Sequence, residues 1–454
     1  KKMLEKMFKL KENNTSVKVE VMGGITTFMT MAYILAVNPS MLEAAGMDKT
    51  AVLIATALAS FIGTLMMAFL ANYPFALAPG MGLNAYFAYT VCGSMGYSWQ
   101  IALMAVFVEG LIFIALSLTN VREAIFNAIP TNLKKGVSVG IGLFIAFIGL
   151  QHAGVVVANS STLVSYIDFT ANFRTAGICA VLALIGLMVI AVLYIKRVKG
   201  AILIGIVVTW VLGILSQAVG LYVPDAEAGF YSLYPVWGFT DITAIGNTFG
   251  KCFTADFSSV RIFDFIAILL SFLFVDMFDT LGTLIGVANK ADMLDKDGKL
   301  PNIKGALLAD AIATSAGAVL GTSTTTTFVE SSSGVGEGAR TGLASVVTGF
   351  LFLVSIVLSP LFCSIPNFAT APALIFVGFL MVSTVVSIDF TDMTESVPAY
   401  LCLLAMPLMY SISEGIAVGV ISYVIINVAA GKAKKITPLM YVLAVLFVCK
   451  YIFL

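Results

Sequence analysis

Long apolar stretches separated by short polar connections recur along the chain from Val21 to the C-terminus. About 20 consecutive apolar residues are enough for a helix to cross a bilayer. The pattern predicts spans at 21–42, 51–71, 99–118, 135–152, 173–195, 201–221, 262–288, 303–320, 341–362 and 369–386. The region 398–430 is interrupted at Ser413-Glu414-Gly415, and we expect two shorter helices there.

Two further segments, 75–92 and 322–340, are too polar or too rich in glycine for simple lipid-facing helices. The stretch 322–327 holds five threonines, whose β-branched side chains favour extended backbone. A lone strand in lipid would leave its amides unpaired, so this strand needs a partner at the same depth. The stretch 74–80 is the candidate partner. We expect two short antiparallel strands, leading into half-helices near Met81 and Glu330.

Counting these segments predicts an all-α polytopic membrane protein with fourteen transmembrane segments. Because each half has its unusual segment in third place and seven spans is an odd number, the second half is expected to be inverted. The strands then lie in segments 3 and 10. We divide the chain into an N-terminus at 1–20, a first repeat at 21–221, an outer connection at 222–261, a second repeat at 262–430 and a C-terminal interface helix at 431–454. The sequence leaves open whether the apolar stretch 437–454 also crosses the membrane.

Composition supports membrane insertion and narrows the class of protein. Hydrophobic residues make up 59% of the 454 residues and charged residues only 11%, against about a quarter in soluble proteins. The formal net charge is zero, so no strong field indicates a nucleic-acid partner. Six scattered cysteines fit small buried residues better than redox or metal sites. Because no nucleophile–base pair or metal-ligand cluster is evident, we expect neither an enzyme nor a bound metal or cofactor.

Basic residues predict the orientation of the chain, because lysine and arginine concentrate on the cytoplasmic side of membrane proteins. With the predicted segments, every basic cluster falls on one side, and both termini are expected to be cytoplasmic in the cell membrane. The clusters are Lys1, Lys2, Lys6, Lys9, Lys11 and Lys18; Arg122, Lys134 and Lys135; Lys196, Arg197 and Lys199; Lys290, Lys296, Lys299 and Lys304; Arg340; and Lys432, Lys434 and Lys435.

Acidic residues within the predicted spans are the strongest functional signal, because charged groups are costly at bilayer depth. Asp276 and Asp279 lie three residues apart and therefore share one helix face. One is expected to accept a substrate N–H and one to carry a proton, since crowded carboxylates in a low dielectric retain protons. A buried hydrogen bond to threonine or backbone is the structural alternative for either residue. For Glu109 and Asp310 we favour hydrogen bonds between helices.

Asn84 and Glu330 occupy comparable positions, each early in its predicted half-helix. An amide and a carboxylate at that place suit the edge of a heterocycle that carries N–H donors and ring-nitrogen acceptors. Helix capping is the alternative. Thr27 of the first span is a further candidate lining residue, although ordinary helix packing explains it almost as well. His152, at the end of the fifth span, fits a packing or rim residue better than a proton relay.

At these motifs the sequence resembles the AzgA-like purine permeases of the nucleobase/cation symporter family 2. The shared stretches are Gly-Gly-Ile-Thr-Thr-Phe-Met-Thr-Met-Ala-Tyr-Ile with Val-Asn-Pro in the first span, Ala-Pro-Gly-Met-Gly-Leu-Asn-Ala at 78–85, Phe-Val-Asp-Met-Phe-Asp-Thr at 274–280 and Gly-Thr-Ser-Thr-Thr-Thr-Thr through Glu-Ser at 321–331. The resemblance covers nearly the whole chain, and the threonine run with its glutamate is highly specific.

The resemblance implies proton-coupled uptake of adenine, guanine or hypoxanthine by alternating access. It implies a core of segments 1–4 and 8–11, a gate of segments 5–7 and 12–14, and possible dimers through the gates. Substrate binding is then expected at Glu330, Asp276, Asn84, Phe328 and Thr27, and proton coupling at Asp276, Glu330 and Asp279. Three alternatives stay open: an anion exchanger of the same fold, a uracil- or xanthine-type permease, and an ion channel. The preferred purine and the choice of proton or sodium also stay open.

Overall fold

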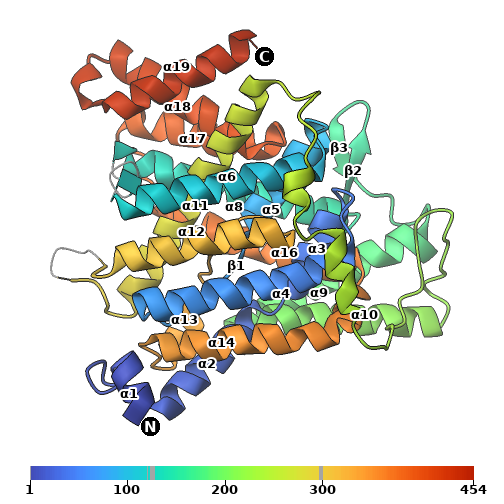
Figure 1. Cartoon of the computed structure of the whole chain (residues 1–454). Coiled ribbons are helices and arrows are strands. Elements are labelled where there is room, and N and C mark those ends of the chain that lie inside the picture. Colours follow the sequence, from blue (N-terminus) through green and yellow to red (C-terminus); the bar gives the residue numbers. More distant parts are fainter. Residues whose placement is uncertain (1, 120, 123–127, 296–299, 454) are drawn as a thin grey trace.

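A computed structural model describes residues 2–119, 121–122, 128–295 and 300–453 of the chain. The molecule is predominantly α-helical, and most of its helices run roughly parallel to one another across it (Figure 1). Among the described residues, ten helices are long and apolar enough to cross a membrane. Lys1, Lys296 and Lys299, which belong to the predicted basic clusters, lie outside the described residues.

The first half of the chain forms helices with one strand, β1, before a short helix in third place and a hairpin, β2 and β3, after α8. Its elements are α1 (Lys2–Phe8), α2 (Val17–Met31), α3 (Ile34–Glu43), α4 (Lys49–Met66), η1 (Met67–Ala71), β1 (Leu77–Pro79), α5 (Met81–Ala85), η2 (Tyr86–Ser94), α6 (Trp99–Leu118), α8 (Thr131–His152), β2 (Val156–Asn159), β3 (Leu163–Tyr166), η3 (Phe173–Gly177), α9 (Ile178–Ile195) and α10 (Ala201–Ala218).

The second half repeats this layout, again with a strand before a short helix in third place. After η4 (Ile242–Asn247) and η5 (Lys251–Thr254) it comprises α11 (Ile262–Lys290), α12 (Ile303–Leu320), β4 (Thr325–Thr327), α13 (Ser331–Gly336), α14 (Gly342–Ser355), η6 (Ile356–Leu358), α15 (Ser359–Cys363), α16 (Asn367–Val382), η7 (Ser383–Ser387), α17 (Met393–Leu408), α18 (Ile412–Ala429), η8 (Ala433–Lys435) and α19 (Pro438–Phe453).

Several helix boundaries differ from the prediction, and at two of them local polar groups decide where the helix begins. α2 begins four residues before the predicted first span, since the Ser16 hydroxyl accepts a hydrogen bond from the Val19 N–H and caps the helix. The break within 398–430, predicted at Ser413-Glu414-Gly415, instead lies just before Ile412. Tyr410 there has a left-handed φ of 52°, and Ser411 caps α18, so Ser413-Glu414-Gly415 form its first turn.

β1 and β4 form a two-stranded antiparallel sheet in the interior, with Leu77 opposite Thr327 and Pro79 opposite Thr325. Neighbouring side chains satisfy backbone groups that this narrow sheet leaves unpaired. Thr64 of α4 bonds both the N–H and the carbonyl of Leu77, and Thr314 of α12 donates to the Thr325 carbonyl at 2.9 Å. The threonine-rich surroundings therefore replace the further strands that a buried sheet would otherwise need.

The helices pack in two groups. In the first, α6 and α4 lie against α12, and α14 lies against α2 and α4. In the second, α16 and α17 pack on α8, α17 packs on α18, and α9 packs on α10 and α16. Glycines allow close approach within the second group, where the backbones of Gly142 and Gly378 meet between α8 and α16. The α5 segment and α11 contact both groups.

The sequence predicted a C-terminal helix, but neither its packing on α18 nor the hairpin that follows α8 was predicted. β2 and β3 form a hairpin between α8 and α9, with Val156 opposite Tyr166. α19 packs along α18, and the Tyr451 hydroxyl near its end donates a hydrogen bond to Glu414 in the first turn of α18. A small apolar cavity lies where α19 meets α8, α11 and α18, and none of the predicted site residues lines it.

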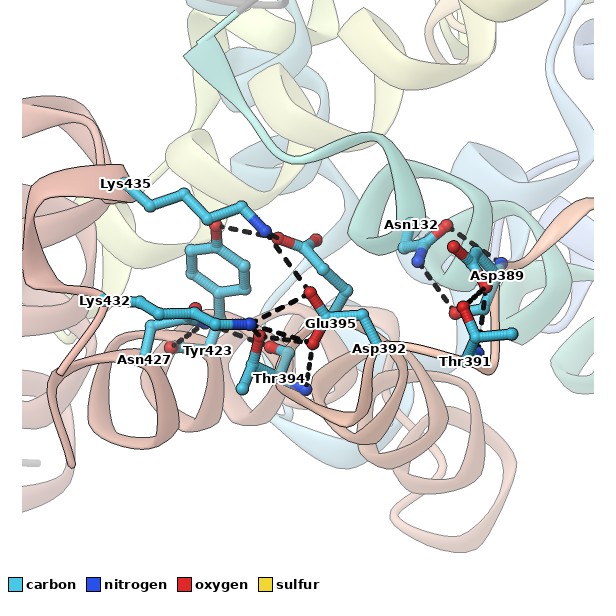
Figure 2. A network of polar contacts seen from close by, with 10 residues as sticks. All are labelled: Asn132, Asp389, Thr391, Asp392, Thr394, Glu395, Tyr423, Asn427, Lys432 and Lys435. Carbon is cyan, nitrogen blue, oxygen red and sulfur yellow. Dashed lines mark hydrogen bonds and ion pairs between the residues drawn. The ribbon is translucent and has the colours of Figure 1, made fainter. Parts of the chain in front are cut away.

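A polar network ties α17 to α18 and the following turn (Figure 2). Asp392 caps α17 and pairs with Lys432 at 3.1 Å, and Glu395 pairs with Lys435 at 2.6 Å. The Thr394 hydroxyl and the Lys432 ammonium hold the pKa of Asp392 well below its usual range. Asp392 is thus ionised at physiological pH, and its stabilising contribution is lost only as pH falls through that depressed pKa. The network therefore holds α17 and α18 together at one end of the molecule.

Candidate functional site

Glu330 lies immediately before α13 and faces α2, the first span. The Tyr33 hydroxyl donates to Glu330 Oε1 at 2.6 Å, and the Thr30 hydroxyl lies 3.5 Å from the Glu330 carbonyl oxygen. Glu330 does not cap α13 with its side chain. It is also partly exposed, whereas most polar residues around it are buried. A partly accessible carboxylate held by one tyrosine is available to accept hydrogen bonds from a ligand.

α13 approaches α2 closely enough that only glycine fits between them. A Cβ on Gly334 would lie 2.2 Å from the Thr27 hydroxyl oxygen and 2.5 Å from the Gly23 carbonyl oxygen. Thr27 is 2% exposed, and its hydroxyl has no hydrogen-bond partner among the described residues. The predicted lining residue Thr27 therefore lies at the α2–α13 contact, one turn of α13 beyond Glu330.

We expect Gly334→Ala to reduce transport and stability, because the added methyl would force α13 away from α2 and shift Glu330 relative to Tyr33. Overpacking of this kind costs about 1–3 kcal/mol. Gly336→Ala is the matched control, since a Cβ there meets nothing within 4 Å. Thermal unfolding and uptake should separate the two variants, and equal behaviour would contradict the close-contact explanation.

Asn84 lies near the end of the short helix α5, and Asp279 of α11 lies beside its start. The Asn84 amide is completely buried, and its carbonyl oxygen accepts a hydrogen bond from the Ser323 hydroxyl next to β4. Asp279 Oδ2 lies 3.3 Å from the position that a Cβ on Gly80 would occupy, so this carboxylate borders the start of α5. Asp279, like Glu330, is partly exposed. The backbone N–H of Phe328 donates to the Ala76 carbonyl, which continues the β1–β4 pairing.

Asp276 occupies a different environment from Asp279, although both belong to α11. It is completely buried and pairs with Arg122, whose Nη2 lies 3.1 Å from Asp276 Oδ2 and 3.0 Å from Asp310 Oδ2. The guanidinium also stacks on Phe113, at 3.7 Å from the ring centroid. Arg122 was predicted to lie in a polar connection between spans, but the structure buries it fully between the two carboxylates.

Glu109 of α6 is a third completely buried acid. Its Oε2 accepts a hydrogen bond from the Thr324 hydroxyl at 2.7 Å, and its Oε1 has no hydrogen-bond partner among the described residues. Asp310 of α12 bonds Thr280 of α11, which is the predicted hydrogen bond between helices, whereas the partner of Glu109 lies in the segment before β4 and not in a helix. His152, which was predicted to be a packing or rim residue, contacts Tyr89, and its Nε2 lies 2.6 Å from the tyrosine hydroxyl.

The structure therefore arranges the predicted residues around β1 and β4 in two layers. The partly exposed layer holds Glu330 and Asp279, and the fully buried layer holds Asp276 with Asp310, Arg122 and Glu109. The central role of Arg122 was missed, because its neighbours in sequence resemble a polar connection. A signal was present: three acids at bilayer depth require a buried cation or retained protons.

The chain has helices of membrane-spanning length, and a pair of short strands interrupts them among buried acids. This combination defines a multi-pass membrane transporter. A profile of the Permease family matches residues 18–418, and the chain belongs to this family. The members of this family are permeases, which are transport proteins.

Characterised relatives match over almost their whole length. The chain is 46% identical to the guanine/hypoxanthine permease PbuO of Bacillus subtilis, with 97% of this chain and 98% of the relative covered. It is 41% identical to the adenine permease AdeP of Escherichia coli, with 100% and 96% covered. Among solved structures, the transmembrane domain of the cyanobacterial bicarbonate transporter BicA shares the fold, with a TM-score of 0.62 at 14% identity over 88% of this chain and 97% of that domain.

Proposed function

We propose that this protein takes up purine nucleobases together with protons across the cell membrane. The observation that carries the proposal is the Glu330 carboxylate, partly exposed at the start of α13 and held by Tyr33. A neutral purine presents ring N–H donors and ring-nitrogen acceptors, and a carboxylate pairs with the former. Relatives named as guanine/hypoxanthine and adenine permeases support these three purines over the pyrimidine uracil and the purine xanthine.

The proposed transport mechanism is alternating access between two domains. We assign the core to segments 1–4 and 8–11 and the gate to segments 5–7 and 12–14, in a seven-plus-seven inverted repeat. The two packing groups support this division, because α6, α12 and α14 belong to the first and α8, α16 and α17 to the second. The core would carry the bound purine past the gate, with both termini in the cytoplasm and dimers formed through the gates.

In the proposed binding mode, Glu330 and Asp279 are the acids that the base reaches, since both are partly exposed. Asn84, Thr27 and Phe328 would complete the site around the β1–β4 sheet. Asp276 would act on the proton rather than on the base, because it is completely buried and paired with Arg122. The likeness to BicA concerns the fold alone, and the acids around β4 disfavour an anion as the substrate.

We expect uptake of radiolabelled hypoxanthine to be inhibited by unlabelled adenine, guanine or hypoxanthine, because these bases share the N–H edge that a carboxylate recognises. Sulfate and chloride, added in large excess, should leave uptake unchanged within about 2-fold. A protonophore should abolish accumulation while permitting equilibration. Purine-insensitive uptake, inhibition by the anions, or large unitary currents would overturn the proposal in favour of an anion exchanger or a channel.

A further inference from the structure

We propose that Asp276 and Asp310 hold one proton between them through the Thr280 hydroxyl, opposite Arg122, and that this cluster is the proton-binding site of the transporter. The proposal deepens the proposed function, on which its transport role rests. It separates the proton from the base: the proton is held in the buried layer, and the purine binds at Glu330.

The Thr280 hydroxyl has more oxygen neighbours than a single proton can serve. Its Oγ1 lies 2.9 Å from Asp276 Oδ1, 3.0 Å from Asp310 Oδ1 and 2.6 Å from Thr326 Oγ1. A hydroxyl donates one hydrogen bond and accepts at most two. If both contacts are two-centre hydrogen bonds and Thr280 donates to one aspartate, the other aspartate must donate to Thr280, which requires a protonated carboxyl. If Thr280 donates to Thr326 instead, both aspartates must be protonated.

The charge balance of the cluster leads to the same conclusion. Arg122 Nη2 lies 3.1 Å from one aspartate and 3.0 Å from the other, and the side chains of all three residues are 0% exposed. Two ionised aspartates would leave a net negative charge away from water, which is strongly unfavourable. One shared proton makes the three side chains neutral together. Phe113 covers the guanidinium face at 3.7 Å and keeps water from it.

Other charged groups around the cluster are also acidic and strengthen the requirement for a proton. Glu109 of α6 interacts electrostatically with Asp276, Asp310 and Arg122, and Asp279 on α11 interacts with Asp276 and Asp310. Among the described residues, Arg122 is the only cation that pairs with these acids. The guanidinium also occupies the place between the two carboxylates that a sodium ion would need. The geometry therefore favours protons over sodium as the coupled ion.

β4 links the proton cluster to Glu330. Thr326 of β4 contacts Thr280 directly, and Glu330 follows four residues later in the same segment. When the shared proton leaves, Thr280 can donate to only one of the two ionised aspartates, so it loses its bond to the other and shifts relative to Thr326. That change is transmitted along the short stretch from β4 to α13 that positions Glu330 against Tyr33. Proton binding and purine binding are thereby coupled without sharing a residue.

The test uses the full-length protein reconstituted in liposomes and the variant Asp310→Asn. An asparagine supplies an N–H to Thr280 but cannot release a proton. The negative charge of Asp276 then balances the positive charge of Arg122. We expect hypoxanthine accumulation driven by an imposed pH gradient to fall at least 10-fold, while hypoxanthine counterflow stays within about 3-fold of wild type. Accumulation retained by Asp310→Asn, or driven by a sodium gradient alone in the wild type, would overturn the proposal.

Thr314→Val is the matched control for this experiment. Thr314 lies one turn after Asp310 on α12, is also 0% exposed, and donates to the Thr325 carbonyl rather than to an acid. Gradient-driven accumulation should therefore survive in Thr314→Val and fail in Thr280→Val, which removes the shared hydroxyl. The same loss in both variants would attribute the effect to general disruption of β4 and overturn the proposed role of Thr280.

An infrared measurement tests the site without any purine. Purified wild-type protein should show a protonated-carboxyl band at neutral pH that is lost in Asp310→Asn, shifted in Thr280→Val and unchanged in Glu330→Gln. A band that is identical in all four proteins would contradict the shared proton. If the wild type transports no purine but shows this pattern, the proposed function fails while the proton site stands.

Discussion

Glu330→Gln is expected to abolish purine uptake without loss of membrane expression. The substitution keeps the size of the side chain and an oxygen that accepts from Tyr33, so the contact between α13 and α2 is preserved. It removes the negative charge that accepts the N–H groups of the base. Loss of a hydrogen bond to a charged group corresponds to about 1.5–3 kcal/mol, or roughly 10- to 150-fold in affinity.

The experiment compares radiolabelled hypoxanthine uptake and equilibrium binding in Glu330→Gln and Glu337→Gln. Glu337 is the matched control, because it lies just beyond α13, is exposed and pairs with Lys199. We expect Glu337→Gln to behave like the wild type. Tyr33→Phe should give an intermediate loss, since it removes the donor that orients Glu330. Normal uptake by Glu330→Gln would rule out the assigned role of this carboxylate.

Arg122→Met is expected to destabilise the protein strongly. It leaves Asp276 and Asp310 without their cation, although both side chains are 0% exposed. Removing one partner of a buried ion pair costs about 3–5 kcal/mol, because the remaining charge is uncompensated. Thermal unfolding in detergent and the yield of monodisperse protein provide the measurement.

Two comparisons distinguish charge imbalance from lost packing. Adding Asp310→Asn to Arg122→Met removes one of the two stranded carboxylates, and we expect partial recovery of thermal stability. Lys49→Met removes a cation that pairs with Glu43 near the surface, where ion pairs contribute little, and should have a far smaller effect. If the double variant is no more stable than Arg122→Met, the packing of Arg122 on Phe113 explains the loss instead.

The positions of the helices and of the discontinuous segments were largely predictable from local chemistry. Stretches of 18 or more apolar residues specify helices in lipid regardless of their neighbours, which is why the prediction for 303–320 coincides with α12. The threonine run likewise favours extended backbone, and β4 forms within it at Thr325–Thr327. Helix ends were less predictable, because single side chains such as Ser16 and Ser411 decide them.

The contents of the site were predictable only as a set of unusual residues. Four residues are conspicuous because polar groups are energetically costly at bilayer depth: Glu330, Asp276, Asp279 and Asn84. Their division into two layers was not predictable. Asp276 and Asp279 are three residues apart on α11, yet one pairs with Arg122 in the interior and the other borders Gly80. A spacing defines a helix face, but the neighbouring helices decide which groups meet that face.

By itself the sequence determined that this chain is a membrane transporter with interrupted third elements and acids at bilayer depth, because hydrophobicity, β-branching and the cost of buried charge act locally. Only the tertiary structure decided which acid received a partner. Arg122 reads as part of a polar connection, but it lies between Asp276 and Asp310, 154 and 188 positions away along the chain. Such pairings depend on how helices distant in sequence pack together, and no local pattern encodes them.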